Sequence, residues 1–255
     1  MPTVHDDMGI AVDLPRPPRR VVSLVPSLTE SVATSLPEVL VGATDWCTHP
    51  DGLDVARVRG TKNPDLAAIA ALRPDLVLAN KEENRELDVR RLREAGIPVW
   101  VTVIETVPQA LNSLRRLFAV ALSADPPSWL ARSQELWCGS LPPVVATVAV
   151  PVWRDPWMVV GRATFTGDLL RRAGLANHFA DHHGRYPRVG VEEIDRADID
   201  AVLLPDEPYA FTDTDGPEAF HRVPTRLVSG RLITWYGPSL VEAHRALANL
   251  VEELR

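Results

Sequence analysis

The amino-acid sequence predicts an α/β fold of two Rossmann-like lobes with parallel sheets, joined by a bridging helix. Short apolar runs alternate with longer amphipathic runs over residues 20–106 and again over residues 142–255, a pattern typical of strand–helix units in parallel sheets. Residues 107–141, between these halves, carry helical patterns alone. The chain has 255 residues, 45% of them apolar, which is enough for two cores.

In the first half, strands are expected at the apolar runs 21–25, 39–43, 76–79 and 99–103. Helices are expected after them, over residues 27–36, 64–72 and 81–95. Each of these helices is preceded by a side chain of the capping type, and Gly96 is placed to end the third. The capping pairs are Ser27 with Glu30, Asn63 with Pro64, and Asn80 with Glu83.

The middle of the chain is expected to form helices over residues 108–122 and 128–137, interrupted by Asp125-Pro126-Pro127. The second half then predicts strands at 144–150 and 201–204 and helices at 165–173, 191–196 and 239–254. The expected organisation is an N-terminal extension (1–19), an N-terminal α/β lobe (20–106), a helical bridge (107–141) and a C-terminal α/β lobe (142–255).

Composition excludes several classes of function. A net charge of −7 and a pI near 5.5 argue against nucleic-acid binding. No run of 18 apolar residues occurs, so no membrane insertion is expected. The first 20 residues lack the apolar region of a signal peptide, which predicts a cytoplasmic protein; an extracytoplasmic location is the alternative if an export signal is missing from this sequence.

Two polar clusters stand where a parallel sheet binds ligands. Residues 60–64 and 80–84 each follow a strand-like run and precede a helix-like run, and ligands of open α/β sheets lie at the carboxyl ends of strands. Capping and the helix macrodipole explain most of this polarity. They do not explain Lys81, a cation at a predicted helix start. The candidate ligand-binding residues here are Lys62, Asn63, Lys81 and Glu82.

Aromatic side chains follow the predicted strands in both halves. Each offers a large contact area at low entropic cost, so together they suit a flat, apolar ligand such as a corrin or a porphyrin, although any one of them can be ordinary packing. Arg154 can neutralise a ligand carboxylate, and Glu207, between two prolines, can orient the ligand. The aromatic candidates are Trp46, Trp153, Trp157, Tyr209, Trp235 and Tyr236.

Cys47 and His49 form a pair that can ligate a soft metal or the axial position of a tetrapyrrole. A buried thiol beside a loop histidine is the alternative. The sequence contains none of the nucleophile-elbow, phosphate-loop, dinucleotide or zinc-protease motifs, so we do not expect an enzyme.

Several short motifs, in order and spacing, resemble the class III substrate-binding proteins, the helical backbone metal receptors. The resemblance covers about residues 20–254 and is carried by Arg-Val-Val-Ser-Leu-Val-Pro-Ser-Leu-Thr-Glu at 20–30, Asn-Pro-Asp-Leu at 63–66, Leu-Arg-Pro-Asp-Leu-Val at 72–77 and Leu-Arg-Glu-Ala-Gly-Ile-Pro-Val at 92–99. Residues 60–63, 79–84 and 153–158 are similar to leaderless bacterial members. The resemblance implies two lobes around a rigid helix and delivery of cobalamin, haem, ferric siderophores or metal ions to an ABC importer.

The resemblance also implies a partner. Family members dock on their permease through one acidic residue on each lobe; Glu192 falls at the C-lobe position, whereas Ala67 occupies the N-lobe position. The predicted function is therefore a binding protein that clamps a cobalamin-like, haem-like or metal-chelate ligand between two lobes for an ABC permease. The alternative is a cytosolic metallochaperone or enzyme that handles a metal or corrinoid with Cys47 and His49.

Overall fold

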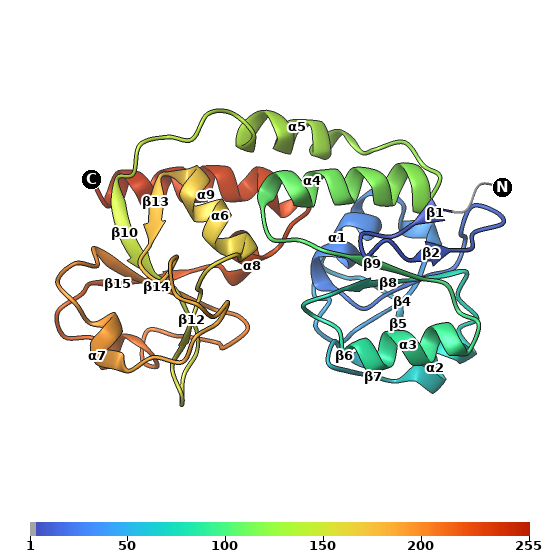
Figure 1. Cartoon of the computed structure of the whole chain (residues 1–255), viewed down its shortest axis with the longest axis horizontal. Coiled ribbons are helices and arrows are strands. Elements are labelled where there is room, and N and C mark those ends of the chain that lie inside the picture. The colour runs from blue at the N-terminus through green and yellow to red at the C-terminus, as the bar shows by residue number, and fades with distance from the viewer. Residues whose placement is uncertain (1–3) are drawn as a thin grey trace. The chain divides into compact units, whose positions relative to one another are not determined.

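The computed structural model describes residues 4–255 and divides into two compact units. Unit 1 comprises residues up to Ile104, Gln109–Arg132 and Tyr236–Pro238. Unit 2 comprises Glu105–Pro108, Ser133–Trp235 and Ser239–Arg255. The chain therefore passes from one unit to the other more than once (Figure 1).

Unit 1 is built on a five-stranded sheet in the order β5-β4-β3-β8-β9, and every neighbouring pair is parallel. The central strand β3 pairs through Val21 with Leu40 on one side and with Leu76 on the other. Because strands β3, β4, β8 and β9 are buried almost throughout, they consist of continuous apolar runs. The strands are β3 (Val21–Ser23), β4 (Leu40–Ala43), β5 (Ala56–Arg57), β8 (Leu76–Asn80) and β9 (Val99–Thr102).

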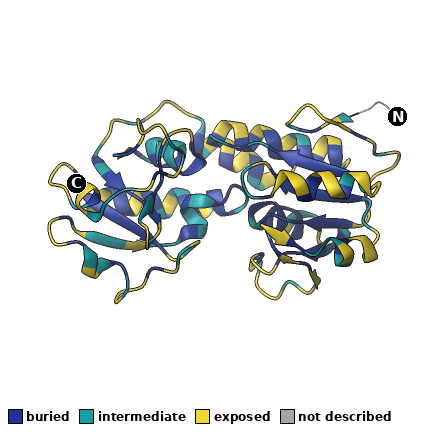
Figure 2. Ribbon diagram, turned by 60° about the horizontal axis from the view of Figure 1, so that its bottom comes forward, coloured by how far each residue is buried: buried dark blue, intermediate teal, exposed yellow. Residues whose placement is uncertain are grey.

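Helices cover both faces of this sheet (Figure 1). On one face, Ile69 of α2 (Leu66–Ala71) and Leu92 of α3 (Glu86–Glu94) pack on Val22 and Val77 in a buried cluster. The other face carries α1 (Pro26–Ser35), which contacts β3 and β4. In Figure 2 the strands of the sheet are buried, and the helices that cover it have a buried side and an exposed side.

The N-terminal residues are part of unit 1. Strands β1 (Val4–His5) and β2 (Ala11–Val12) form an antiparallel hairpin. The buried carboxylate of Asp6 accepts a hydrogen bond of 2.7 Å from Arg93, and Asp7 forms an ion pair with Arg116. These buried or half-buried charges fix the hairpin on the body of the unit.

The segment 107–141 contains the predicted helices. Helix α4 (Val107–Arg116) continues directly into the π-helical turn η2 (Leu117–Ala121), and α5 (Ser128–Trp137) follows after the prolines. Within residues 4–255, no helix combines the length and apolarity needed to cross a bilayer.

Unit 2 contains a four-stranded parallel sheet in the order β13-β10-β14-β15. An antiparallel hairpin, β11 (Pro151–Trp153) and β12 (Met158–Val159), follows β10. Val202 and Leu204 of β14 lie in a buried cluster with Phe179, Phe211 and other apolar side chains. The sheet strands are β10 (Ala146–Ala149), β13 (Leu175–Asn177), β14 (Ala201–Pro205) and β15 (Thr225–Val228).

The helices of unit 2 include two that the sequence placed closely. Helix α6 (Phe165–Ala173) ends at Gly174, whose φ of 92° is the left-handed conformation that favours glycine. Helix α9 (Ser239–Glu253) buries Leu240, Leu247 and Leu250 on one face. Unit 2 also contains α7 (Val191–Ile194), α8 (Gly230–Thr234) and the 3-10 turn η3 (Pro217–Ala219), while the 3-10 turn η1 (Pro37–Val39) belongs to unit 1.

The fold class predicted from the sequence is confirmed, and Gly96 follows α3 with a φ of 76°, as predicted, but the three predicted N-terminal caps of unit 1 are wrong. Asn63 and Pro64 do not start a helix; they form β7, which pairs with β6 (Arg59–Gly60), and Asp65 caps α2 by accepting the N–H of Ala68 at 2.9 Å. Asn80 ends a strand, and the helix after it begins only at Glu86.

The caps at α1 differ in the same way. Ser27 lies inside α1, and the residue before that helix is Val25, which has no capping side chain. Lys81 consequently lies in a turn rather than at a helix start, and the argument from the macrodipole does not apply to it.

Tyr236, Gly237 and Pro238 belong to unit 1, although their neighbours on both sides belong to unit 2. The N–H of Tyr236 donates to Ser27 Oγ at 3.3 Å. A Cβ on Gly237 would lie only 2.6 Å from Ser31 Oγ, so the backbone approaches α1 as closely as glycine permits.

Candidate functional site

The loops at the carboxyl end of the unit 1 sheet are joined by hydrogen bonds. Lys62, in the turn between β6 and β7, donates its Nζ to the carbonyl of Glu82 at 2.5 Å. Glu82 lies in the turn after β8, 20 residues further along the chain. The two polar clusters of the sequence are thus in direct contact.

Asn84 holds these loops together and is buried. Its Nδ2 donates to the carbonyls of Thr61 at 3.0 Å and Leu24 at 3.3 Å, and its Oδ1 accepts the N–H of Asn80 at 2.9 Å. One amide therefore satisfies backbone groups from three separate loops. Such a fully bonded buried amide fixes the arrangement of the loops that it joins.

A second network extends from Asn80 to Tyr236. Asn80 donates to Thr102 Oγ1 at 3.1 Å and accepts the N–H of Glu82 at 2.8 Å. The hydroxyl of Tyr236 donates to Glu83 Oε1 at 3.1 Å. Burial, followed by the charge of Glu83, raises the pKa of Tyr236 well above its ordinary value, so this phenol stays a donor.

Trp46 is the most exposed large apolar side chain of the described chain, with 65% of its surface accessible to solvent. It lies in the loop after β4, against the backbone of the β6–β7 turn. A Cβ on Gly60 would lie 3.3 Å from the Nε1 of Trp46, so the edge of the indole lies against this turn. A large aromatic face is consequently presented to solvent at the carboxyl end of a parallel strand.

Cys47 and His49 follow Trp46 but face different environments. The Cys47 thiol is fully buried, 3.0 Å from Thr29 Oγ1 and 3.1 Å from Thr44 Oγ1, and burial raises its pKa. Metals require the thiolate, which this environment disfavours. His49 is half-buried, and its Nδ1 lies 3.1 Å from Thr48 Oγ1. Among residues 4–255, no three His, Cys, Asp or Glu side chains form a metal-binding group.

Asn63 and Lys81 are exposed on the same loops of unit 1. The backbone N–H of Lys81 donates to Thr102 at 3.0 Å, so its position is fixed while its side chain lies in solvent. Both remain predicted ligand contacts.

In unit 2, Arg154 is engaged by acidic side chains of its own unit. It forms an ion pair with Asp215 and donates to Glu218 at 2.7 Å, and its guanidinium lies 5.2 Å over the ring of Trp157. The hydrogen bond to Glu218 raises the pKa of Arg154. A ligand carboxylate would therefore compete with two carboxylates for this cation.

The aromatic candidates of unit 2 form a connected group. Trp153, 45% exposed, stands edge-on to Tyr209 at 5.5 Å, and the Tyr209 hydroxyl donates to Asp215 at 2.6 Å. Trp157 stacks on Phe211 at 5.8 Å with the planes 5° apart. Trp153 is thus the exposed end of an aromatic group that is packed at its other end.

Glu207 lies in the loop after β14, with its backbone against Gly230. A Cβ on Gly230 would lie 2.7 Å from the Glu207 carbonyl oxygen. Trp235 is a framework residue, since only 5% of its surface is exposed, and Tyr236 is equally buried.

The two predicted docking positions are both exposed. Glu192 lies in the first turn of α7 in unit 2, and Ala67 lies in the first turn of α2 in unit 1. Asp65, near Ala67, is committed to capping α2.

Sequence reasoning did not single out Asn84, Asp215 or Glu218 as site residues. Asn84 carried a weak signal, because it stands four residues after Asn80 in the same polar run. Asp215 and Glu218 carried none, since they lie more than 60 residues from Arg154.

Proteins of similar sequence include transport proteins. The vitamin B12-binding protein of Pectobacterium atrosepticum is 24% identical over 93% of this chain and 90% of its own length. An uncharacterised ABC transporter substrate-binding lipoprotein of Bacillus subtilis, YvrC, is 25% identical over 98% of this chain and 85% of its own length. No protein-family model matches the chain.

Solved structures of the same fold cover almost the whole chain. The periplasmic vitamin B12-binding protein BtuF of Vibrio cholerae has a TM-score of 0.75 at 17% identity, covering 93% of this chain and 98% of its own. The haem-binding protein RhuT of a Roseiflexus species has a TM-score of 0.73 at 19% identity, covering 91% and 99%. Helicobacter pylori CeuE with bound Ni(II) has a TM-score of 0.80 at 16% identity, covering 100% and 90%.

These relatives bear on the predicted location and on the alternative function. The predicted cytoplasmic location is wrong, because the relatives are lipoproteins or periplasmic proteins, which points to a place outside the cytoplasm. The alternative of a cytosolic metal-handling protein finds no relative among them. The resemblance seen in the sequence is confirmed: the chain is a homologue of the vitamin B12-binding and ABC transporter substrate-binding proteins and has the class III fold.

Proposed function

We propose that this protein binds a flat tetrapyrrole, cobalamin-like or haem-like, or a metal chelate, for delivery to an ABC permease. The observation that carries the proposal is the exposure of one tryptophan in each unit, Trp46 and Trp153. Trp46 follows β4 of one parallel sheet, and Trp153 ends the hairpin strand β11, which follows β10 of the other. Exposed tryptophans in the segments that follow parallel strands suit the apolar face of a macrocycle.

The loops of unit 1 support this proposal because hydrogen bonds within the protein hold them in place. Asn84 and Lys62 join the loop segments that carry the predicted polar contacts. A preformed site pays less entropy when the ligand binds. The names of the relatives, which include B12-binding, haem-binding and nickel-bound proteins, agree with this ligand class.

The proposal is tested by titrating purified protein with cyanocobalamin, hemin and a ferric catecholate chelate while following visible absorption and melting temperature. At least one probe should shift its spectrum and raise the melting temperature. Trp46→Ala and Trp153→Ala should each weaken that binding about tenfold, the effect expected for losing an aromatic contact of about 1.4 kcal/mol. Leu141→Ala, which removes an exposed apolar side chain elsewhere, should not. Folded protein that binds none of the probes would refute the ligand class.

Glu192 is the proposed contact to the permease in unit 2. It is exposed in α7, whereas the neighbouring Glu193 is used internally, accepting the N–H of Gly190 at 2.7 Å. Glu192→Ala should reduce co-purification with the cognate permease and leave ligand binding unchanged. The exposed Glu38→Ala serves as the charge-matched control. Equal co-purification of both variants would exclude Glu192 from the interface.

A further inference from the structure

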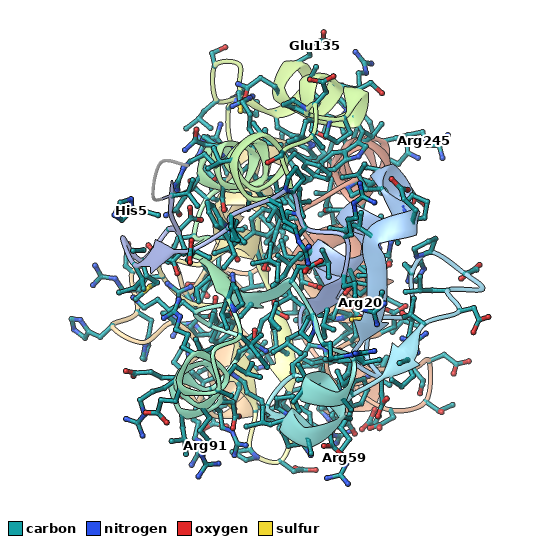
Figure 3. All side chains as sticks on the ribbon, turned by 90° about the vertical axis from the view of Figure 1, so that its right-hand side faces the viewer. His5, Arg20, Arg59, Arg91, Glu135 and Arg245 are labelled. Atoms are coloured by element: carbon teal, nitrogen blue, oxygen red, sulfur yellow. The ribbon has the colours of Figure 1, made fainter. Side chains whose placement is uncertain are left out.

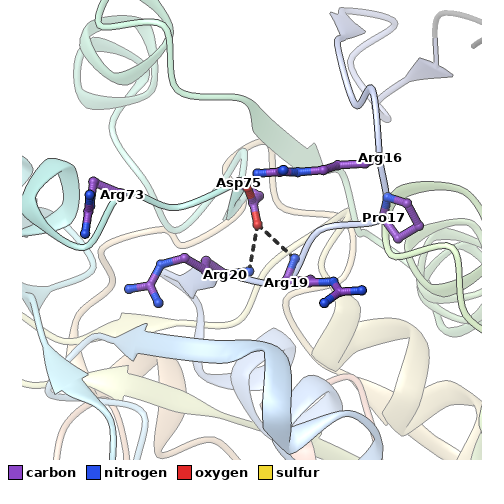
Figure 4. A pocket seen from close by; sticks show the side chains of 6 residues that line it. All are labelled: Arg16, Pro17, Arg19, Arg20, Arg73 and Asp75. Carbon is purple, nitrogen blue, oxygen red and sulfur yellow. Dashed lines mark hydrogen bonds and ion pairs between the residues drawn. The ribbon is translucent and has the colours of Figure 1, made fainter.

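A basic pocket lies at the opposite end of the unit 1 sheet from the loops described above. It has a volume of about 590 Å³ and is formed by the segment that leads into β3 and by the turn that leads into β8 (Figure 4). Strands β3 and β8 are parallel neighbours, so their amino ends meet at this edge. The lining residues are Arg16, Pro17, Arg19, Arg20, Arg73 and Asp75.

Asp75 organises the pocket. Its carboxylate accepts the backbone N–H groups of Arg19 at 2.9 Å and Arg20 at 3.0 Å, and the guanidinium of Arg16 at 3.2 Å. The backbone N–H of Arg19 is the main reason that the pKa of Asp75 is lowered. Asp75 is thus an ionised anchor that holds the arginine-bearing backbone in place.

The pocket is strongly positive in a protein that is negative overall. Its lining carries four arginines and one carboxylate, while the whole chain has a net charge of −7. Four cations gathered around one anion repel one another, and the arrangement is stabilised by adding negative charge. The local field therefore favours an anion.

Two of the guanidinium groups are available for such an anion. Within residues 4–255, the side chains of Arg19 and Arg73 make no hydrogen bond or ion pair with protein, and both are exposed. Arg20 is oriented by its two hydrogen bonds, 2.9 and 2.7 Å, to the carbonyl of Leu72. Figure 4 shows Arg73 and the guanidinium of Arg20 on one side of Asp75 and Arg19 on the other.

The backbone at Arg73 supports a role for its side chain. This residue follows the end of α2 with a φ of 45°, the left-handed region where glycine or asparagine is the usual choice. An arginine there costs backbone energy that glycine would not. Arg73 thus places a cation at the rim of the pocket in a backbone conformation that lowers the stability of the fold.

We propose that this pocket binds a phosphate-bearing anion, at a site separate from the ligand site of the proposed function. The planar guanidinium fork matches phosphate oxygens in pairs, and several forks around one depression suit more than one phosphate oxygen at a time. The pocket lies at the amino ends of the strands, whereas the proposed ligand loops lie at their carboxyl ends. The anion can be a free diphosphate or the headgroup of an anionic phospholipid, since both present the same chemistry.

The test compares these two sources on the whole protein. Pyrophosphate is titrated by calorimetry, and vesicles of equal parts phosphatidylglycerol and phosphatidylcholine are used in flotation, both in about 50 mM NaCl so that charges are weakly screened. The double variant Arg19→Gln/Arg73→Gln removes the two available forks. Arg91→Gln/Arg245→Gln removes two exposed arginines elsewhere, which project from α3 and α9 into solvent (Figure 3). Melting temperatures report that all proteins are folded.

Wild-type protein should bind at least one of the two probes, and the probe that binds identifies the source of the phosphate. The pocket variant should lose about tenfold or more in affinity for that probe, while the control variant stays within about twofold of wild type. Neither variant should change hemin or cobalamin binding, which separates this test from that of the proposed function. Failure of the wild type to bind either probe, or an equal loss in both variants, overturns the proposal.

Discussion

Replacing Asn84 by alanine is expected to loosen the loops of unit 1 and to destabilise the protein. The change removes three side-chain hydrogen bonds, to Asn80, Thr61 and Leu24. Each such bond contributes about 1 kcal/mol net, and a buried partner left unsatisfied costs about 1–3 kcal/mol. Some of the freed groups regain water at the loop surface, so we expect a loss of about 2–4 kcal/mol in the free energy of unfolding.

For a protein of this size, 1 kcal/mol shifts the melting temperature by about 2–4 °C, so Asn84→Ala should lower it by about 4–16 °C in calorimetry. Asn112→Ala is the matched control, because Asn112 is exposed on α4 and alanine is the better helix former there. Asn84→Asp keeps the acceptor for Asn80 but places a carboxylate against two carbonyls, so it should also destabilise. If Asn84→Ala and the Asn112→Ala control have the same melting temperature, the Asn84 amide does not hold the loops in place.

Three further predictions concern single side chains. Tyr236→Phe removes the hydrogen bond to Glu83. The wild type should lose stability as the pH rises above about 10, because the raised pKa keeps the phenol protonated in the native state while the phenol of the unfolded chain ionises. The variant should lack this loss when its free energy of unfolding is measured in urea as a function of pH. Cys47 should react with a thiol reagent at pH 8 at least about tenfold more slowly than the half-buried Cys138, and equal rates would show that its burial is not maintained. Gly230→Ala sets a Cβ 2.7 Å from a carbonyl oxygen, so it should cost about 1–3 kcal/mol in chemical denaturation; an unchanged midpoint would mean that the loop after β14 moves aside freely.

The sequence was a good guide to the sheet strands because parallel strands are buried on both faces. Four predicted runs correspond to β4, β8, β9 and β14, namely 39–43, 76–79, 99–103 and 201–204. A short, continuous apolar run between polar loops is typical of a strand that is buried on both faces. The sequence did not predict the short strands β6 and β7, because their pairing depends on a turn of polar residues that carries no apolar pattern.

The helix starts show where local preference gives way to tertiary structure. Asn63 followed by proline is a good local cap, yet both residues pair with β6, and Asp65 takes over as the cap two residues later. Asn80 bonds Thr102 and the turn after β8 instead of a helix end. Capping preferences of about 1 kcal/mol are easily outweighed by several buried contacts.

The candidate site was predictable in its loops but not in its internal bonding. The loops of Trp46 and Lys62 follow from strand ends alone, whereas Trp153 lies in the hairpin strand β11, which the sequence did not predict. The partners of Arg154 could not be foreseen, because Asp215 and Glu218 are distant in sequence and their own segment has no periodic pattern. The burial of Tyr236 was equally hidden, since it depends on contacts with residues some 150 and 200 positions earlier.

The return of Tyr236–Pro238 to unit 1 bears on how the protein is made. Ser27 and Glu83 are synthesised 209 and 153 residues before Tyr236, whose backbone and phenol they contact. Domains usually fold in the order in which they are translated. Here the first unit acquires its final contacts only after Ser133–Trp235 of the second unit have been translated, so a chain released at residue 235 would hold an unfinished first unit as well as a shortened second one.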